Sequence, residues 1–311
     1  MTSIRKKDLA DVCAIVVSHN GREWLDAALS SLMASAGECS VEVVVVDNGS
    51  DGAGEWAAAR FPGVRSIHCE NRGFGHANNR GLELTRSRYV LFLNPDTEVL
   101  SGTLAELVAV LDAKPDIGLA GTRQLRTDGE LAPSIRRFPS PARGWAEALG
   151  VEQVPLARRA LGERELDAAA YDRCTPCDWT SGSFMLARRS ALEAVGHFDE
   201  SFFLFSEETD LCWRLKRDGW RIVHLPQMTI KHHEQPHWAN AQMEAQLAYA
   251  RLQFARKHLP GSRLYRCSLA LRYALRVGAY SVPGRRSPRR REAARAALGA
   301  VLAARPPFRP A

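Results

Sequence analysis

Through its first 120 residues the chain alternates two hydrophobic patterns. Continuous apolar runs rich in β-branched residues predict strands buried on both faces, and apolar residues spaced three and four apart predict helices. The expected strands are 12–17, 41–46, 64–69, 89–93 and 117–122, and the expected helices are 22–36, 54–60, 77–84 and 104–111. This alternation favours an α/β fold in which a mostly parallel, Rossmann-like sheet is flanked by helices.

The pattern becomes less regular between residues 123 and 178, which contain five prolines and several charged stretches. We interpret this segment as an excursion from the sheet. Periodicity then returns, and the expected elements are a strand over 179–187, helices over 189–195 and 208–218, a short strand over 221–225 and a long helix over 238–258.

The composition is that of an ordinary globular protein. Of its 311 residues 45% are hydrophobic and 25% are charged, which excludes a largely disordered chain. No run of about 18 uncharged apolar residues occurs, so we expect neither a transmembrane helix nor a signal peptide. The seven scattered cysteines favour a reducing cytoplasm over a disulfide framework. Cys174 and Cys177 have CxxC spacing without a second such pair, so we expect them to be structural.

The net charge of +7 is unevenly distributed. Residues 260–311 contain twelve arginines and one acid, a net charge of +11, so residues 1–259 carry −4. We therefore expect a folded domain over 1–259 and an Arg-rich, amphipathic, helical tail over 260–311. Such a tail favours an anionic membrane surface as a partner. A solvated tail and packing against the body are the alternatives, and nucleic acid is not expected because few aromatic residues accompany the arginines.

Three polar clusters directly follow expected strands, at residues 18–20, 47–50 and 94–96. The carboxyl ends of parallel strands form the ligand crevice of an open α/β sheet, so these clusters predict a nucleotide-type site. Asp96, at the tip of a buried strand, is a candidate ligand for Mg²⁺ or Mn²⁺ held together with substrate phosphates. The alternative is a plain turn, since Asn, Pro and Asp are turn formers.

Further candidates lie in the second half of the chain. Glu207 and Glu208 fall at an expected helix start, where acids complement the helix dipole. The alternative is that one of the two carboxylates is a general base. His232 gains a metal-binding role only if the fold brings it beside Asp96.

Taken together, these segments resemble glycosyltransferase family 2, which has the GT-A fold, and within it the rhamnosyltransferase-like branch. The resemblance spans about residues 12–235 and leaves out the tail. The motifs that carry it are, in order, VVSHN (16–20), VVVDNGS (44–50), NRGFG (71–75) with Ala77, Asn79 and Gly81, LNPD (93–96), GSFML (182–186) with Arg188 and Arg189, GHFDE (196–200), residues 205–214, and His232.

The resemblance implies an inverting, metal-dependent transfer of a sugar, such as rhamnose, from a dTDP- or UDP-linked donor. The acceptor would be a glycan or a lipid-linked sugar in cell-surface polysaccharide synthesis, at the inner face of the plasma membrane. A nucleotide-binding half would cover about 10–122 and an acceptor-side half about 123–259. Carried over by position, Asp47 contacts the base, and Asp96 and His232 hold Mg²⁺ or Mn²⁺. The implied donor-binding residues are Ser18, Asn20, Asp47, Asn48, Arg72, Asn79 and Asn94.

The catalytic base of this family is usually the second acid of a Glu-Asp pair. That position is Glu208, and the pair here is Glu207-Glu208. Glu208 would take the proton of the acceptor hydroxyl as the hydroxyl attacks the sugar. Asn94 replaces the first acid of the commoner Asp-x-Asp motif, which leaves Asp96 as the single carboxylate. Two other functions stay open: a non-catalytic sugar-nucleotide or glycan-binding module on the same fold, and a nucleotidyltransferase.

Overall fold

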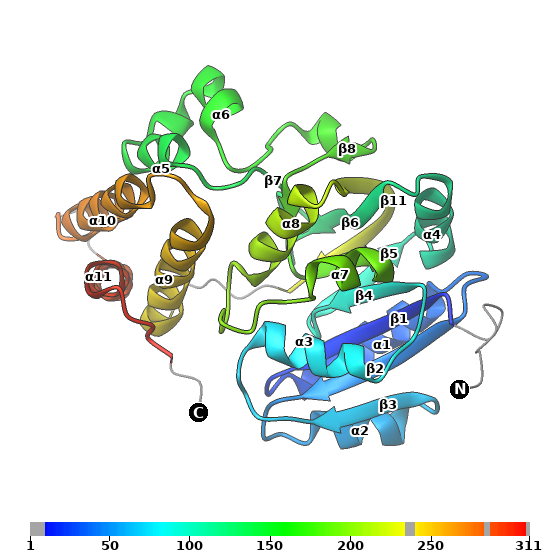
Figure 1. Ribbon diagram of the computed structural model, residues 1–311. Coiled ribbons are helices and arrows are strands. Elements are labelled where there is room, and N and C mark those ends of the chain that lie inside the picture. Colours follow the sequence, from blue (N-terminus) through cyan, green and yellow to red (C-terminus); the bar gives the residue numbers. More distant parts are fainter. Residues whose placement is uncertain (1–9, 234–239, 283–286, 309–311) are drawn as a thin grey trace.

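A twisted sheet forms the body of the protein, whose computed structural model describes residues 10–233, 240–282 and 287–308 (Figure 1). Within these residues the strand order is β3-β2-β1-β4-β10-β6-β11-β5. The first four are parallel neighbours, and β10 and β5 run antiparallel to the strands beside them. Their bounds are β1 Val12–Ser18, β2 Val41–Asp47, β3 Val64–His68, β4 Tyr89–Leu93, β5 Thr97–Ser101, β6 Ile117–Leu125, β10 Phe184–Arg188 and β11 Arg221–His232.

Helices cover both faces of the sheet, as the continuous apolar strands require. Along β1, Val12, Ala14 and Val16 pack on one face, and Cys13, Ile15 and Val17 pack on the other. Because side chains alternate along a strand, both sets need a cover. The covering helices are α1 (Arg22–Ala34), α2 (Ala53–Arg60) and α4 (Leu104–Ala113) on the first face, and α3 (Phe74–Glu83), α7 (Arg189–Val195) and α8 (Glu207–Arg217) on the second. The expected α/β fold with a mostly parallel sheet is confirmed.

Two expected strands differ from those observed, and one observed strand was not expected. The range 179–187 holds two strands: β9 (Trp179–Thr180) pairs with β7 (Ile135–Arg136), and β10 enters the main sheet after a turn at 181–183. Small polar residues and Gly182 allow that turn. The expected strand 221–225 continues as β11 to His232, through a register shift between Leu225 and Thr229. The edge strand β5 was not expected, because its alternating pattern is short and polar.

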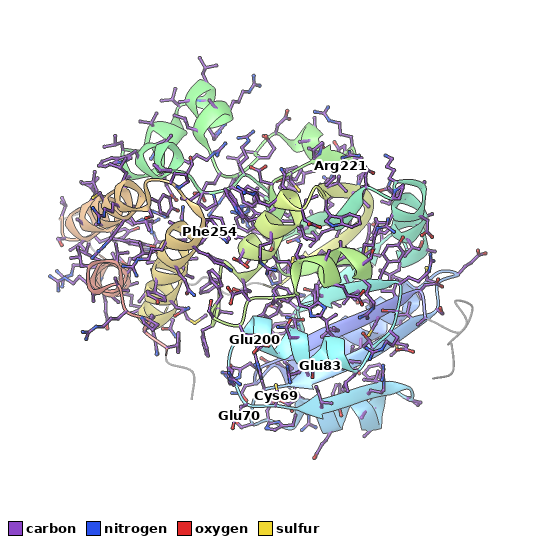
Figure 2. All side chains as sticks on the ribbon, in the orientation of Figure 1. Cys69, Glu70, Glu83, Glu200, Arg221 and Phe254 are labelled. Atoms are coloured by element: carbon purple, nitrogen blue, oxygen red, sulfur yellow. The ribbon has the colours of Figure 1, made fainter. Side chains whose placement is uncertain are left out.

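The excursion contains two short helices that join a larger helical group beside the sheet (Figure 1). The members of this group are α5 (Pro141–Ala148), α6 (Pro155–Leu161), α9 (Ala241–His258), α10 (Ser262–Ala279) and α11 (Pro288–Ala303). Figure 2 shows Phe254 of α9 between this group and the sheet. Its ring lies 5.7 Å from that of Trp213 on α8 and 6.3 Å from that of Phe138. Aromatic packing therefore joins the helical group to α8.

The basic tail is folded as α10 and α11, whose inner faces pack on α9 and α5. Tyr265 and Tyr273 are fully buried between these helices, and Gly144 of α5 leaves room for Tyr265, whose ring would lie 2.9 Å from a β-carbon there. Among the alternatives for the tail, the structure shows packing against the body for the inner faces of α10 and α11. In the part of the chain that the structure describes, no helix combines the length and the hydrophobicity needed to cross a membrane.

A nearly buried charge network ties α5, α9 and α10 together. One guanidinium nitrogen of Arg251 lies 3.0 Å from a carboxylate oxygen of Glu147 and 2.6 Å from one of Glu163. Arg272 lies 2.9 Å from the other oxygen of Glu147. Arg251 also donates a hydrogen bond of 3.0 Å to the hydroxyl of Tyr265. Desolvated charges of this kind depend on each other, since removing one leaves another without compensation.

We expect Arg251→Ala to lower the free energy of unfolding by about 3–5 kcal/mol, because Glu147 and Glu163 would both stay buried after losing the cation that they share. Urea denaturation followed by circular dichroism measures this loss. The matched control is Arg221→Ala, which removes an exposed pair with Asp116 (Figure 2) and should cost less than about 1 kcal/mol. Equal losses in the two variants would show that the buried network has no special weight.

Candidate active site

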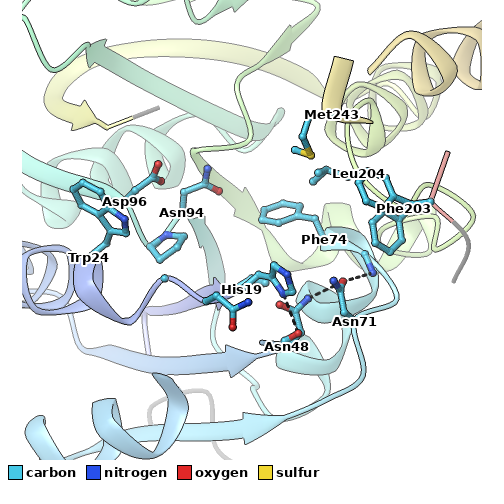
Figure 3. Close-up of a pocket in the computed structure, with 16 residues that line it drawn as sticks. His19, Trp24, Asn48, Asn71, Phe74, Asn94, Asp96, Phe203, Leu204 and Met243 are labelled. Carbon is cyan, nitrogen blue, oxygen red and sulfur yellow. Dashed lines mark hydrogen bonds between the residues drawn. The ribbon is translucent and has the colours of Figure 1, made fainter. Parts of the chain in front are cut away.

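A cavity of about 450 Å³ lies where the carboxyl ends of β1 and β4 meet the helical group (Figure 3). One side of it is polar and comes from the strand ends, and the other is apolar. The polar side holds three of the expected residues, Asn20, Asn48 and Asn94, and Asp96 lies beside them. The remaining lining residues are Val17, His19, Gly21, Trp24, Asn71, Gly73, Phe74, Pro95, Phe203, Leu204, Met243 and Phe308.

The loops after β1 and β2 lock each other in place. Ser18 pairs with Asp47 in the parallel register, so both loops start at the same level. Asn20, in a left-handed conformation with φ of 54°, accepts a hydrogen bond of 2.8 Å from the backbone of Ser50. A β-carbon at Gly49 would lie 2.5 Å from the backbone nitrogen of Asn20, so only glycine fits there. The edge of the cavity is therefore rigid.

Two buried polar atoms at this edge lack hydrogen-bond partners within the described residues. They are the hydroxyl of Ser18 and the side-chain oxygen of Asn48. Asn48 lines the cavity, and its amide nitrogen donates to Asn71 over 3.4 Å. Unsatisfied buried polar atoms are costly and call for an explanation such as a ligand. Asn48 is thus suited to accept a hydrogen bond from a ligand in the cavity.

Asp47 lies behind the cavity lining rather than in it. Its carboxylate is almost fully buried and accepts hydrogen bonds of 3.0 Å from the backbone nitrogens of Gly49 and Gly54. The second of these bonds fixes the start of α2. Asp47 therefore holds the loop after β2 and the start of α2 in place. Each of its carboxylate oxygens retains a lone pair that a ligand could use.

Asn94, Asp96 and His232 lie together, which meets the condition for a metal-binding role of His232. His232 is at the end of β11, and its ring nitrogen Nε2 lies 3.2 Å from Asp96 Oδ1 and 3.3 Å from Asn94 Nδ2. The next residue, His233, lies 3.0 Å from Glu98 and stacks on Trp24 with ring centroids 5.0 Å apart. The described residues contain no group of three or more acids, histidines and cysteines able to hold a metal by themselves.

One carboxylate and one imidazole nevertheless fit a hard divalent cation that takes its other ligands from a diphosphate and water. Mg²⁺ is commonly held in proteins by one or two carboxylates together with substrate phosphates. Asp96 is partly exposed at 22% of its side-chain surface, so a ligand in the cavity can reach it. The donor set is therefore compatible with the expected Mg²⁺ or Mn²⁺.

Arg72 and Asn79 do not line this cavity. Arg72 is exposed on the loop before α3. The side chain of Asn79 accepts a hydrogen bond of 3.1 Å from the backbone nitrogen of Phe198 and donates bonds to Phe198 O and to Glu200. It therefore anchors the loop after α7 to α3. The structure gives Asn79 this anchoring contact and brings neither residue to the cavity wall.

Glu207 and Glu208 begin α8, close to the cavity but outside its lining. Glu207 is buried and Glu208 is partly exposed. Burial raises the pKa of Glu207, and the negative charges of Glu208 and Asp210 raise it further. Burial also raises the pKa of Glu208, against the opposing effect of backbone N–H groups and of Arg136. One oxygen of each carboxylate has no hydrogen-bond partner within the described residues.

The backbone that presents these acids is strained. Phe205 and Ser206, directly before α8, have φ values of 68° and 66°, a left-handed conformation that costs free energy in residues other than glycine. Glu208 lies beside Gly182, where a β-carbon would be 3.9 Å from its side chain. The next residue, Ser183, accepts a hydrogen bond of 3.0 Å from the backbone of Asn94. The turn at 182–183 thus contacts both Glu208 and the strand end that is followed by Asp96.

A second buried acid, Asp210, fixes α8 to α9. Its carboxylate is inaccessible and contacts Arg214 at 2.8 Å and both Lys257 and His258 at 2.6 Å. These partners outweigh the burial and lower the pKa of Asp210 to about 2. Asp210 is therefore an ionised anchor, in contrast to the two glutamates before it.

The apolar side of the cavity was largely missed by sequence reasoning. Phe74 donates its backbone N–H to Phe203 O over 3.0 Å. This close approach is possible because Gly73 has no β-carbon, which would clash with that carbonyl. The ring of Phe308 stacks on Phe203 with centroids 5.2 Å apart. Nothing in the local sequence marks Phe308 or Met243, which reach the cavity through long-range packing.

The comparisons with known proteins agree with this geometry. Residues 13–196 match the model of glycosyl transferase family 2. Over 240 residues the chain is 33% identical to the N-acetylglucosaminyl-diphospho-decaprenol L-rhamnosyltransferase of Mycobacterium tuberculosis, covering 73% of this chain and 77% of that protein. Rhamnosyltransferase WbbL of Escherichia coli K12 is 26% identical over 232 residues, covering 71% and 83% of the two chains.

Solved structures agree with the fold. The mannosyltransferase PcManGT from Pyrobaculum calidifontis, solved in complex with GDP-Man and Mn²⁺, superposes with a TM-score of 0.54 at 19% sequence identity. The superposition covers 96% of this chain and 82% of that one. The sheet, its strand-end cavity and the family match over more than half of the sequence lead to one assignment. The protein has the GT-A fold and belongs to glycosyl transferase family 2, as a rhamnosyltransferase-like glycosyltransferase.

Proposed function

We propose that this glycosyltransferase moves a sugar from a nucleoside diphosphate donor to a lipid-linked acceptor with inversion at the anomeric carbon, in cell-surface polysaccharide synthesis. The observation that carries the proposal is the meeting of Asn94, Asp96 and His232 at the open end of the sheet. The two rhamnosyltransferase relatives favour rhamnose as the sugar, and one of them is named for a lipid-linked acceptor. A dTDP- or UDP-linked donor is our corresponding expectation.

The polar side of the cavity suits the nucleotide and its phosphates. Asn48, with an unpaired buried oxygen, and Asn20 would contact the nucleoside, while Ser18 and Asp47 hold the loops that carry them. Asn94 would lie beside the diphosphate. Arg72 and Asn79 stay in the proposal only as residues near the donor, since neither lines the cavity.

Asp96 and His232 would hold Mg²⁺ or Mn²⁺ together with the donor diphosphate. When bound, the ion would neutralise negative charge that grows on the leaving diphosphate. His232 is oriented by its contacts with Asn94 and Asp96, and its neighbour His233 is fixed by Glu98 and Trp24. The chain thus supplies a preformed pair of ligands at the phosphate end of the cavity.

Glu208 is the proposed general base, with Glu207 as its buried neighbour. A hydroxyl is a weak nucleophile, so a carboxylate must accept its proton as the bond to the anomeric carbon forms. The raised pKa of Glu208 makes it a better proton acceptor than an ordinary carboxylate. Glu208 is partly exposed, whereas Glu207 is enclosed, so Glu208 is the one that an acceptor can reach. Attack from its side, opposite the diphosphate, inverts the configuration.

The acceptor would approach past the aromatic pair Phe203 and Phe308 and the turn at Gly182. The stacked rings of Phe203 and Phe308 would offer an aromatic face to a sugar ring, and residues 136–178 of the excursion would help to shape the acceptor side. We further propose a cytoplasmic location, with the acceptor presented at the inner face of the membrane. The alternative of a non-catalytic binding module would show donor binding without turnover.

A donor panel tests the reaction. We expect one dTDP- or UDP-sugar, with Mg²⁺ or Mn²⁺ and a short-chain lipid diphosphate sugar as acceptor, to give nucleoside diphosphate release that stops when EDTA is added. The thermal stability of the protein should rise with the same donor and metal. Stabilisation without release, with every acceptor tried, would favour the binding module. No response to any donor by a folded protein would contradict the proposed function.

Two substitutions separate the proposed roles. We expect Asp96→Asn to abolish the metal-dependent thermal stabilisation by donor and hence turnover. Glu208→Gln should keep that stabilisation and lose about 10²–10⁴-fold in kcat, which is the usual contribution of a general base. Asp128→Asn, an exposed turn carboxylate, is the matched control and should behave as wild type. Full turnover by either site variant would refute its assigned role.

The buried acids also make stability depend on pH. Because the folded-state pKa of Glu207 is raised, folding is favoured by the protonated form, and its contribution is lost as pH rises from the ordinary carboxyl value through the raised one. Glu207→Gln should therefore raise Tm by a few degrees at pH 8 and by much less at pH 4. Differential scanning calorimetry at both pH values measures this, and an equal shift at the two would argue against a titrating Glu207.

A further inference from the structure

The outward face of α10 carries an apolar stripe that the described part of the chain leaves open to solvent. Leu264 is 58% exposed, Leu275 is 50% exposed, and Val282, just beyond the helix, is 53% exposed. Small or apolar residues at helical spacing connect them. We call this set the outer stripe of α10; its residues are Leu264, Cys267, Leu271, Ala274, Leu275, Gly278 and Val282.

The outer stripe is separate from the packing face of the same helix. Tyr265, Leu269 and Tyr273 point inward and are buried against α9 and α11. The helix is thus apolar on two sides. Three of its four arginines face the protein: Arg272 and Arg276 pair with acids, and Arg266 donates to backbone carbonyls near the end of α11. Exposed apolar surface beyond scattered single residues marks an interaction site. The outer stripe therefore calls for a cover that the described chain does not supply.

The charges around the stripe indicate the nature of this cover. Arg263 is the exposed arginine of α10, and α11 carries four arginines with Glu292 as its one acid. Of these four, Arg289 and Arg295 are among the exposed ones. An apolar stripe on a helical pair with exposed arginines matches an anionic membrane surface, where apolar side chains enter the acyl boundary and guanidinium groups meet lipid phosphates.

Other covers fit less well. A symmetric contact between two copies would bring the arginines of both copies together without acids to compensate them. Nucleic acid would match the arginines but leave the apolar stripe exposed. A second exposed apolar segment lies in the same helical group, at Leu149 and Leu156 around the start of α6. Figure 1 shows α6 in the same helical group as α10, beside the sheet.

We propose that the outer stripe of α10 binds the surface of a membrane rich in anionic lipid. The inference rests on the proposed function in one respect: it gives the lipid-linked acceptor a place from which to reach the cavity. Met243 of α9 and Phe308, which follows α11, line the cavity and belong to the helical group that carries the stripe. Membrane binding through α10 thus holds one wall of the active site at the bilayer.

Vesicle flotation of the full chain tests this surface. We expect retention on vesicles of phosphatidylcholine with 30% phosphatidylglycerol, weak retention on phosphatidylcholine alone, and a marked loss at about 0.5 M salt, where charges are screened. Leu264→Glu combined with Leu275→Glu should weaken partitioning at least tenfold. Arg263→Glu should weaken it about fivefold or more, which is the effect of one cation near the surface.

Matched controls are Leu84→Glu with Leu100→Glu, two exposed leucines of the sheet domain, and they should float as wild type. An environment-sensitive fluorophore on Cys267, which is more exposed than the other cysteines in the described residues, should brighten only with anionic vesicles. Equal flotation of stripe variants, controls and wild type would overturn the proposal, as would a wild-type dimer that the stripe variants dissociate in light scattering.

The donor response separates this proposal from the proposed function. Stripe variants should keep the metal-dependent thermal stabilisation by donor and the transfer to a short-chain acceptor. They should lose transfer to a long-chain acceptor embedded in anionic vesicles. If the wild-type protein floats with vesicles and the stripe variants do not, but no donor gives stabilisation or turnover, the membrane surface is supported and the proposed reaction is wrong. If donor turnover is intact but the wild-type protein does not float, the proposed reaction is supported and the membrane surface is wrong.

Discussion

Burial of the central strands on both faces is the constraint on which the rest of the structure depends. Because β1, β2 and β4 have no face left for polar side chains, their chemistry can appear only at their ends. Parallel pairing of β1 with β2 then brings Ser18 to the level of Asp47. Parallel pairing of β1 with β4 brings the carboxyl ends of these two strands to the same edge of the sheet. A cavity with polar groups on one wall follows from this arrangement, before any particular ligand is considered.

Buried charges hold the helical group together and join it to the sheet domain. Asp210 on α8 pairs with two cations on α9 and so links the sheet domain to the helical group. Arg251 on α9 pairs with an acid on α5 and another after α6, which links helices within the group. Each centre is held by several partners, so neither charge is left alone in a low dielectric. The two glutamates before Asp210 lack such partners. Their pKa values are raised by burial, and the two residues before them are left-handed, so the start of α8 is a locally strained part of the fold.

Sequence reasoning succeeded where one local pattern decides the outcome. The alternation of strands and helices follows from local patterns, and so does the position of Asp96 after a buried strand. The meeting of Asp96 with His232 was implied only by the family resemblance, because the expected strand 221–225 ends seven residues before His232. Sequence reasoning failed where contacts are long-range. Trp24 has helical spacing and resembles a core residue, yet it lines the cavity. Phe308 carries no local signal, and β5 is too short and polar to be recognised without its partner β11.

The excursion leaves the sheet after β6 and returns at β10, and these two strands are antiparallel neighbours. Its two ends are therefore held close together by the sheet itself. A segment anchored in this way can be lengthened, shortened or exchanged at small entropic cost and without moving the register of either strand. The excursion and the strand ends that line the cavity are in this sense separate modules, so one could diversify in evolution, or be grafted by design, while the other stayed constant.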